Sequence, residues 1–207
     1  GTSAHLTNSF LESNRRVWTW AAWVKRSGLG TTQQLFVGGP DDADRLNIRF
    51  ESDDRLGVDE YSSGATQLYI KTARVFRDPA AWMHLTVAFN SDDIQADRLK
   101  IYCNGERVTD LNVTTAVPLS YQGRINSQAT HFIGKHAPSS GQYYNGLMGE
   151  VHFIDGQDLS PEAFGFFDGQ GLWMPKPFKG TFATGGSYGN KVTFAPAILN
   201  SGRAGDK

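Results

Sequence analysis

Apolar and polar residues alternate with a period of two along several segments of this chain. Successive side chains of a β-strand point to opposite faces, so this alternation predicts strands that bury one face and expose the other. The two clearest strands are predicted to bury Trp18, Trp20, Ala22 and Val24 in the first and Met83, Leu85, Val87 and Phe89 in the second. Further strands are predicted at 46–50, 56–58, 68–70, 99–103, 106–111 and 131–134.

Turn and helix signals complete the pattern. Asn104-Gly105 stands between two predicted strands, and both residues accept positive φ, so a type I′ hairpin is expected there. Helix is scarce, and the candidate is a short one over Ser160–Phe164, with Ser160 as N-cap and Pro161 at the first helical position. A content of 23 glycines and 12% aromatic residues also fits an all-β sandwich or barrel.

The stretch 144–160 reads as a glycine turn, an alternating strand, a second turn and a helix cap. Its alternation predicts that Leu147, Val151 and Phe153 share one face. The opposite face is predicted to carry Met148, Glu150, His152 and Ile154.

The character of the chain changes after about Gly165, where turns and aromatic residues replace the alternation. We therefore predict a sandwich over residues 1–165 and an irregular arm over 166–207. The arm either packs on the sandwich or leads to another module.

Charge and composition exclude several classes of protein. The 207 residues include 20 basic and 21 acidic ones, a formal net charge of -1, so the electrostatic footprint of a nucleic-acid-binding protein is absent from the sequence. No apolar run approaches the ~20 residues of a membrane-spanning helix. The segment 1–5 has no charged head or apolar centre, so no signal peptide is expected. Cys103 is the single cysteine, and its apolar parity predicts a buried core thiol.

Several motifs stand in an order that resembles laminin G-like and concanavalin A-like β-sandwiches. They are Trp18–Lys25, the W-x-H-x-x-V strand at 82–87, the L-x-x-Y-x-N-G hairpin at 99–105, Phe132–Lys135 and Tyr144–Ser160. The resemblance implies an antiparallel two-sheet jelly-roll β-sandwich with a short helix and the C-terminal arm. Such domains usually carry one more strand before the equivalent of 1–3, which suggests a longer polypeptide or another segment in that place.

A narrower resemblance is to the laminin G-like modules of bacteriophage tail-fibre and virion appendage proteins. The residues that carry it are Asn14–Trp20, Val75–Trp82, Glu150–Gly156, Gly171–Lys176 and Gly180–Phe182. It implies a binding module without enzymatic activity, located in a virion appendage, that attaches to bacterial surface carbohydrate. It also implies contacts with other fibre subunits, and a homotrimer is a reasonable hypothesis.

Catalytic chemistry has little support in the sequence. Retaining glycoside hydrolysis needs two carboxyl groups about 5–5.5 Å apart, and the strand at 150–154 offers Glu150 alone. The neighbours Asp53/Asp54 and Asp59/Glu60 point to opposite faces if they lie on strands. The five histidines lack zinc-ligand spacing, and there is no Gly-x-Ser-x-Gly elbow. A glycoside hydrolase remains the third alternative, and it requires two facing carboxylates in one cleft.

No cofactor is expected, with calcium as an open alternative. Asp41, Asp42 and Asp44 follow Gly39-Pro40 in a predicted loop, and calcium binds several oxygen ligands on flexible loops. The favoured interpretation is that these are solvated turn carboxylates. The related pentraxins bind calcium with acidic residues before the closing strand. The equivalent stretch 135–144 has no carboxylate, so that site is not carried over.

Aromatic residues near strand ends are the better candidates for ligand contact. A tyrosine can stack on the C–H face of a sugar and form hydrogen bonds at its rim. The candidate ligand-binding residues are Tyr61, Tyr121, Gln142, Tyr143, Tyr144 and Asn145. The alternative is that the tyrosines pack on the arm or on another subunit. Trp18, Trp20, Trp23 and Trp82 are predicted to be core residues, and Trp173 is left open.

These observations favour a glycan-binding module over a structural virion domain that makes protein contacts. A sugar site predicts exposed aromatic residues beside Asn, Asp and Gln at a loop edge. A structural role predicts a broad exposed apolar patch.

Overall fold

The computed structural model describes residues 4–136 and 141–182, and the backbone of 192–194. Within these residues the first sheet consists of β1 (Leu6–Ser9), β3 (Gln33–Gly38), β4 (Arg45–Phe50), β5 (Arg55–Ser62), β6 (Ala65–Val75), β10 (Leu111–Thr115) and β11 (Thr130–Ile133). The second consists of β2 (Val17–Arg26), β7 (Met83–Asn90), β8 (Leu99–Cys103), β9 (Glu106–Arg107), β12 (Gly146–Asp155) and β15 (Val192–Phe194). A separate hairpin pairs β13 (Gly165–Phe167) with β14 (Trp173–Pro175), and two 3₁₀ turns are η1 (Gln95–Asp97) and η2 (Pro161–Ala163).

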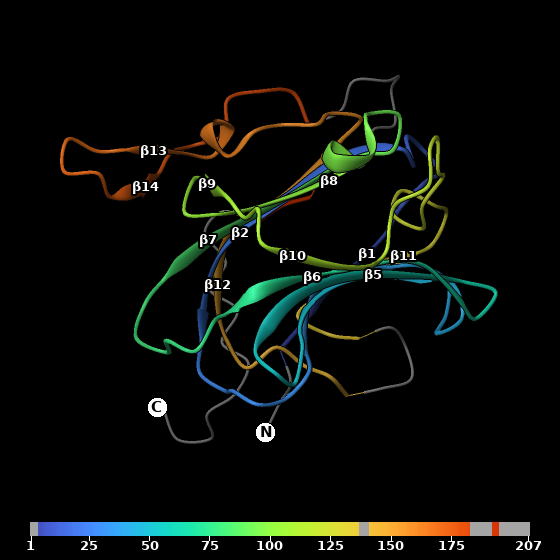
Figure 1. Cartoon of the computed structure of the whole chain (residues 1–207), viewed down its shortest axis with the longest axis horizontal. Coiled ribbons are helices and arrows are strands. Elements are labelled where there is room, and N and C mark those ends of the chain that lie inside the picture. Colours follow the sequence, from blue (N-terminus) through green and yellow to red (C-terminus); the bar gives the residue numbers. More distant parts are fainter. Residues whose placement is uncertain (1–3, 137–140, 183–191, 195–207) are drawn as a thin grey trace.

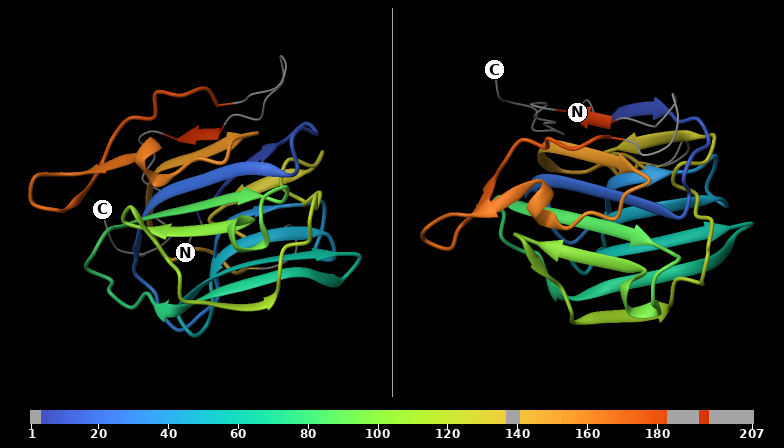
Figure 2. Two further views of the ribbon diagram at one scale, coloured as in Figure 1. Left: turned by 45° about the horizontal axis from the view of Figure 1, so that its top comes forward. Right: turned by 90° about the horizontal axis from the view of Figure 1, so that it is seen from above.

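The two sheets lie face to face as a sandwich (Figures 1 and 2). The first has the order β1-β11-β3-β4-β5-β6-β10, the second β15-β12-β2-β7-β8-β9, and the paired strands are antiparallel. This confirms the predicted all-β, two-sheet antiparallel architecture. No helix in the described residues is long and apolar enough to cross a membrane.

The core between the sheets contains the alternating residues predicted for β2, β4 and β7. Trp18 and Trp20 are fully buried, and the Trp18 ring stacks on Phe89 with centroids 5.1 Å apart. Each large apolar side chain buried in this way stabilises the fold by roughly 1.5–3 kcal/mol.

Cys103 is a buried free thiol in the same cluster, as predicted, and burial raises its pKa.

The predicted faces of β12 are wrong at its beginning. Met148 packs in the main core together with Val151 and Phe153, whereas Leu147 does not belong to that cluster. The cause is a β-bulge: the register with β2 shifts between Gly149 and His152, and Glu150 has φ 49°. One extra residue reverses the alternation on either side of it.

The Asn104-Gly105 hairpin is confirmed, with φ 51° and 81° at its two central residues. The partner strand is shorter than predicted, since β9 ends at Arg107. The chain then crosses to the other sheet, where β10 pairs with β6.

The predicted helix at 160–164 is a single 3₁₀ turn, η2. Pro161 occupies its start as expected, but Ser160 makes no side-chain capping hydrogen bond. Ser160 therefore stands at the N-cap position, as predicted, without the side-chain hydrogen bond of a capping residue.

The described part of the arm packs on the outer face of the second sheet. Phe178 and Phe182 join a small cluster built on Ala21, Ile154 and Phe164. The β13–β14 hairpin instead projects from the sandwich, as the orange segment of Figures 1 and 2 shows. The edge of the second sheet next to β12 is formed by β15.

Candidate functional site

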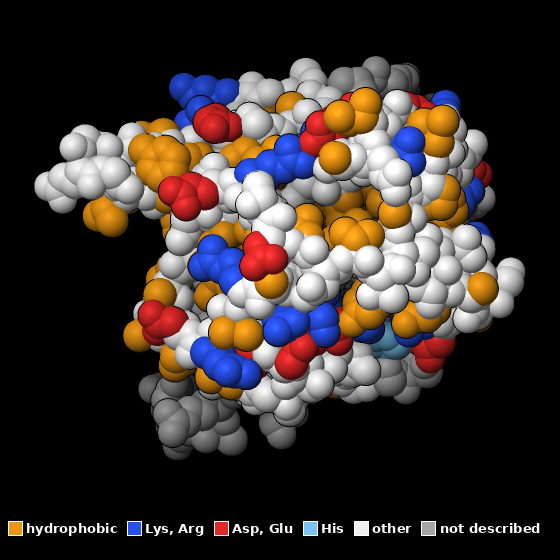
Figure 3. Space-filling model, in the orientation of Figure 1, with side chains coloured by type: hydrophobic (Ala, Val, Ile, Leu, Met, Phe, Trp, Pro, Cys, Tyr) orange, Lys and Arg blue, Asp and Glu red, His pale blue; other side chains and the backbone are white. Residues whose placement is uncertain are grey.

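A cleft lies where the projecting hairpin faces the beginning of β7. It consists of two adjoining hollows of about 360 and 200 Å³, both lined by Arg74, Trp82, Cys103 and Asn104. We call it the Trp82 cleft. Figure 3 shows the molecule hollowed on this side, between the hairpin and the body of the sandwich.

Trp82 is 39% exposed, so its predicted place in the core is wrong. Its position in the sequence gives the reason: Met83, Leu85 and Val87 point inward, and Trp82 therefore has the parity of the outer face. The same argument accounts for Trp23, which is half-buried on the outer face of β2. The alternation was therefore a sufficient signal for Trp82, although residue type alone suggested burial.

Polar side chains from regular elements border the tryptophan. Asn104 lies in the β8–β9 turn and lines the cleft, and its Oδ1 accepts a hydrogen bond from the His84 N–H at 2.8 Å. Glu106 on β9 is exposed and lines the larger hollow, and Arg74 lines both. The cleft thus combines a flat aromatic face with hydrogen-bond donors and acceptors.

The hairpin forms the remaining wall through Phe167, Leu172 and Trp173. Trp173 is buried against two glycines, and a Cβ placed on Gly105 or Gly165 would lie 2.3 or 2.5 Å from its indole ring. The close packing of the indole on these glycines anchors the hairpin beside the β8–β9 turn.

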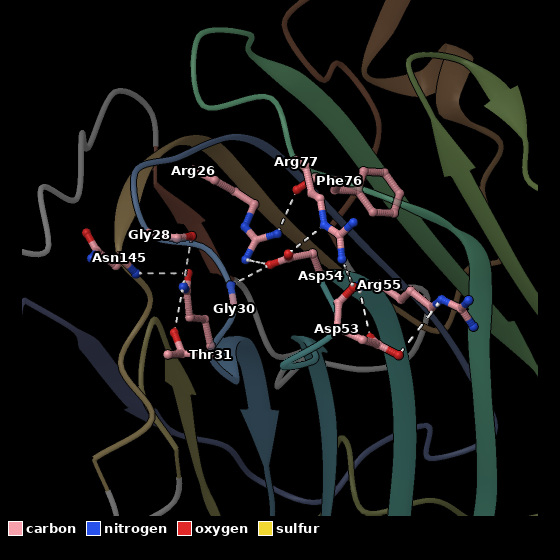
Figure 4. A network of polar contacts seen from close by, with 11 residues as sticks. Arg26, Gly28, Gly30, Thr31, Asp53, Asp54, Arg55, Phe76, Arg77 and Asn145 are labelled. Carbon is pink, nitrogen blue, oxygen red and sulfur yellow. Dashed lines mark hydrogen bonds and ion pairs between the residues drawn. The ribbon is translucent and has the colours of Figure 1, made fainter.

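A buried ionic network holds the segment that carries Trp82 (Figure 4). Arg26 is fully buried, donates to the Phe76 carbonyl at 2.7 Å and pairs with Asp54 at 3.0 Å. The second oxygen of Asp54 pairs with Arg77 at 2.9 Å, so both Phe76 and Arg77 are tied to the turn before β5. Burial alone would raise the pKa of Asp54, but hydrogen bonds from Gly30, Arg77 and Arg26 lower it.

Two histidines lie under the arm beside the cleft. His84 is 1% exposed, its ring centroid is 5.3 Å from Trp23 and 5.9 Å from Trp173, and neither of its ring nitrogens has a hydrogen-bond partner among the described residues. Burial, reinforced by the neighbouring His152, lowers the pKa of His84 to about 3. His84 is therefore a neutral spacer between the sheet and the arm.

The structure places the sequence-predicted ligand residues elsewhere, and none of them lines the Trp82 cleft. Tyr144 is 1% exposed within the core, so the prediction of a surface contact for it was wrong. Its backbone N–H donates to the Gly134 carbonyl at 2.9 Å, and its ring stacks on Phe50 with centroids 6.5 Å apart. Gln142 accepts a hydrogen bond from Gln34 at 2.9 Å, Tyr143 is half-buried near His5, and Asn145 is exposed.

Tyr61 and Tyr121 also have structural partners. The Arg45 guanidinium lies 5.0 Å from the Tyr61 ring centroid. The Tyr121 hydroxyl donates to Glu60 at 2.7 Å, inside the sandwich. Burial raises the pKa of Glu60 to about 7.

The carboxylates proposed for calcium each have protein partners. Asp41 accepts from the backbone N–H groups of Ala43 and Asp44, Asp42 lies 3.9 Å from Arg45, and Asp44 pairs with Arg124. In the part of the chain that the structure describes, no group of three or more His, Cys, Asp or Glu residues is arranged to hold a metal ion.

Two carboxylates do share the outer face of the first sheet. Arg49 lies between them, 3.0 Å from Glu51 and 3.1 Å from Asp59. Asp59 is 1% exposed, and burial raises its pKa to about 6. One guanidinium therefore forms ion pairs with both carboxylates.

A larger hollow of about 720 Å³ lies at the arm, lined by Leu159, Ala163, Phe166, Pro177, Phe178 and other residues. Its polar lining is Gln157, Lys176 and Lys179, and the Gln157 amide already donates to the Thr181 carbonyl at 2.6 Å. The Trp82 cleft differs from this hollow because it combines an exposed tryptophan with an amide and a carboxylate.

No curated protein matches this chain. A laminin G family model, described as the concanavalin A-like lectin/glucanases superfamily, matches residues 1–163. The chain belongs to this superfamily. The matched region ends before the hairpin, so this superfamily domain supplies Trp82, Arg74, Asn104 and Glu106, and the arm supplies the opposite wall.

Solved structures share the fold at low sequence identity. A pentraxin from Limulus polyphemus is 18% identical with a TM-score of 0.52, over 75% of this chain and 71% of that one. A putative carbohydrate-binding protein from Bacteroides ovatus is 17% identical with a TM-score of 0.52, over 73% of this chain and 41% of that one. The enzymatically active domain of bacteriophage CBA120 tailspike protein 2 is 12% identical with a TM-score of 0.53, over 77% of this chain and 25% of that one.

Proposed function

We propose that this chain is a non-enzymatic carbohydrate-binding module and that the Trp82 cleft is its binding site. The observation that carries the proposal is a tryptophan, 39% exposed, in a cleft lined by Arg74, Asn104 and Glu106. A pyranose ring presents an apolar C–H face that stacks on an indole, while its hydroxyl groups form hydrogen bonds with such side chains. The lectin/glucanases superfamily and the putative carbohydrate-binding protein from B. ovatus support a carbohydrate as the ligand.

The biological role that we propose is attachment of a phage tail fibre or virion appendage to a bacterial surface glycan. Its support is the motif resemblance of Val75–Trp82 and Glu150–Gly156, together with the fold shared with a phage tailspike domain. The Limulus pentraxin is heptameric, and we propose that this module also acts as a homo-oligomer, for which a trimer is the working hypothesis. Several weak sites on one oligomer would then bind a repetitive polysaccharide with high avidity.

A glycan array tests the binding site. Folded wild-type protein is compared with Trp82→Ala and Tyr143→Ala, which separates the cleft from the loop predicted from the sequence. We expect binding of at least one bacterial polysaccharide, loss of that binding in Trp82→Ala, and retention in Tyr143→Ala. Stacking on one aromatic ring contributes about 0.5–1.5 kcal/mol beyond area burial, so a loss of at least about 2–10-fold is expected. Loss in Tyr143→Ala alone would place the site at the loop instead.

A structural role is the second candidate, because the hairpin exposes apolar side chains. Phe166, Phe167, Leu172 and Met174 are 48%, 48%, 59% and 40% exposed, and Figure 3 shows apolar side chains at the base of this projection. Exposed apolar clusters commonly mark protein contacts. Absence of glycan binding by folded, oligomeric protein would favour this role.

A further inference from the structure

Arg74 lines the Trp82 cleft, and its guanidinium has no hydrogen-bond or ion-pair partner among the residues that the structure describes. It lies near the end of β6, is exposed, and lines both hollows. Its Cζ atom is 4.9 Å from the centroid of the Phe76 ring, and no described residue forms a hydrogen bond or an ion pair with its guanidinium. The nearby Arg77 differs, because its Nε is bound to Asp54 at 2.9 Å.

This arrangement suits recognition of a carboxylate. Contact with the Phe76 ring restrains the guanidinium while its N–H edges stay available. A guanidinium edge binds a carboxylate through two parallel, charge-assisted hydrogen bonds, which are stronger than bonds between neutral groups.

We propose that the ligand of the Trp82 cleft is an acidic saccharide. Its carboxylate binds Arg74, and a sugar ring stacks on Trp82. The Asn104 amide and the Glu106 carboxylate are left for hydroxyl groups, and Glu106 repels any pose that turns the acid toward it. This inference rests on the proposed function, because it requires that the cleft bind sugar.

The shared chemistry is a sugar carboxylate, which uronic acids and sialic acids both supply. The test uses an array of bacterial surface polysaccharides that contain either type, each printed beside its carboxyl-reduced form. Reduction removes the charge and keeps the stereochemistry of the rest of the chain. Wild-type protein, Arg74→Gln, Trp82→Ala and Arg16→Gln are compared.

Arg16→Gln is the matched control, because it removes one charge at a distant place. Arg16 is exposed and pairs with Asp92. It lies directly before the first residue of β2, Val17, which pairs with Asn90. The cleft adjoins the opposite end, where Val24 pairs with Met83.

The expected result is binding of an acidic polysaccharide, little binding of its reduced form, and a loss of about 10–100-fold in Arg74→Gln, the range for hydrogen bonds to charged groups. Arg16→Gln should bind like the wild type. Equal binding of acidic and reduced forms, lost in Trp82→Ala but not in Arg74→Gln, would overturn the acidic ligand and leave the proposed function standing. No binding of any form would overturn both.

Discussion

Gly105 shows how one missing side chain shapes the cleft. Its φ of 81° lies in the left-handed region, and the Trp173 indole occupies the space that a Cβ would need. The hairpin turn and the anchor of the opposite wall therefore depend on the same residue.

We predict that Gly105→Ala destabilises the protein by more than the backbone strain of about 1–2 kcal/mol, because the methyl group also displaces Trp173. Urea unfolding measures the change, and the displaced wall should also weaken glycan binding. Gly64→Ala is the matched control: its φ is 75°, and nothing lies within 4 Å of the added Cβ. Equal losses in the two variants would contradict the role of Trp173.

At this scale the sequence predicted the core well and the surface poorly. Trp18, Trp20 and Cys103 are buried, as their positions in the alternating pattern indicated. Trp82 is exposed, as its position in the pattern indicates, although tryptophan was expected in the core. Tyr144 was misassigned because its loop was taken to be exposed. Its ring packs in the main core and its backbone N–H pairs with Gly134, and no local pattern shows these tertiary contacts.

Among the elements, the turn before β5 connects two others, because its Asp54 binds both β2 and the β6–β7 loop that leads to Trp82. Arg26 from β2 and Arg77 from that loop meet at Asp54, whose φ is 64°. No sequence pattern indicated this network, because Arg26 and Arg77 are 28 and 23 positions from Asp54.

We predict that Asp54→Asn destabilises the fold by about 3 kcal/mol, because it leaves the buried Arg26 guanidinium without a counter-charge. Asparagine also tolerates positive φ, so backbone strain is not added. Arg77→Gln should cost about 1 kcal/mol or less, since that side chain is 59% exposed. Equal losses in both variants would contradict the account.

The pH dependence of Asp54→Asn has a definite sign. The pKa of Asp54 is lowered in the fold, so its stabilisation is present above the ordinary pKa of 3.8 and is lost as the pH falls through the folded value. The stability curves of wild type and variant should therefore converge in acid.

The contact between the arm and the second sheet is predicted to be sensitive to acid. His84 lies among Trp23, Phe164 and Trp173, and the titratable groups facing this cluster are His152 on β12 and Glu150, 3.5 Å from His152. The folded pKa of His84 is about 3, so the unfolded chain takes up its proton near 6.5 and folding stability falls as the pH drops below that value.

We predict that His84→Phe retains more of its stability than the wild type between pH ~7 and pH ~5. Thermal unfolding at the two pH values measures this difference. Burial also lowers the pKa of His131, to about 4, but His131 is present in both the wild type and the variant. The difference between the two proteins therefore reports the contribution of His84. The same loss in both proteins would contradict the prediction.

The alternation predicted β2, β4 to β8, β11 and β12, but it missed β1, β3 and β10 of the first sheet. It also missed two departures from the regular pattern. The bulge at Glu150 reverses the parity of β12, and the chain leaves the β8–β9 hairpin after Arg107 to join the other sheet. Both depend on how β12 and β10 pair with distant strands, so local periodicity does not contain them.

For the whole molecule, the notable feature is that the cleft combines four regions of the sequence, one of which is β2 with Trp23. Arg74 and Trp82 come from the β6–β7 region, Asn104 and Glu106 from the β8–β9 hairpin, and Trp173 from the arm. Motifs identified the superfamily, which the family model confirms over residues 1–163. The site itself required the tertiary structure, because the arm closes it from outside the matched region.

The most direct test of the central claim is a glycan titration followed by the indole N–H signals of the five tryptophans in NMR spectra. We predict that the Trp82 signal shifts on addition of a polysaccharide fragment selected from the array, while the signals of the fully buried Trp18 and Trp20 remain in place. An unshifted Trp82 signal at saturating glycan would contradict binding at the Trp82 cleft.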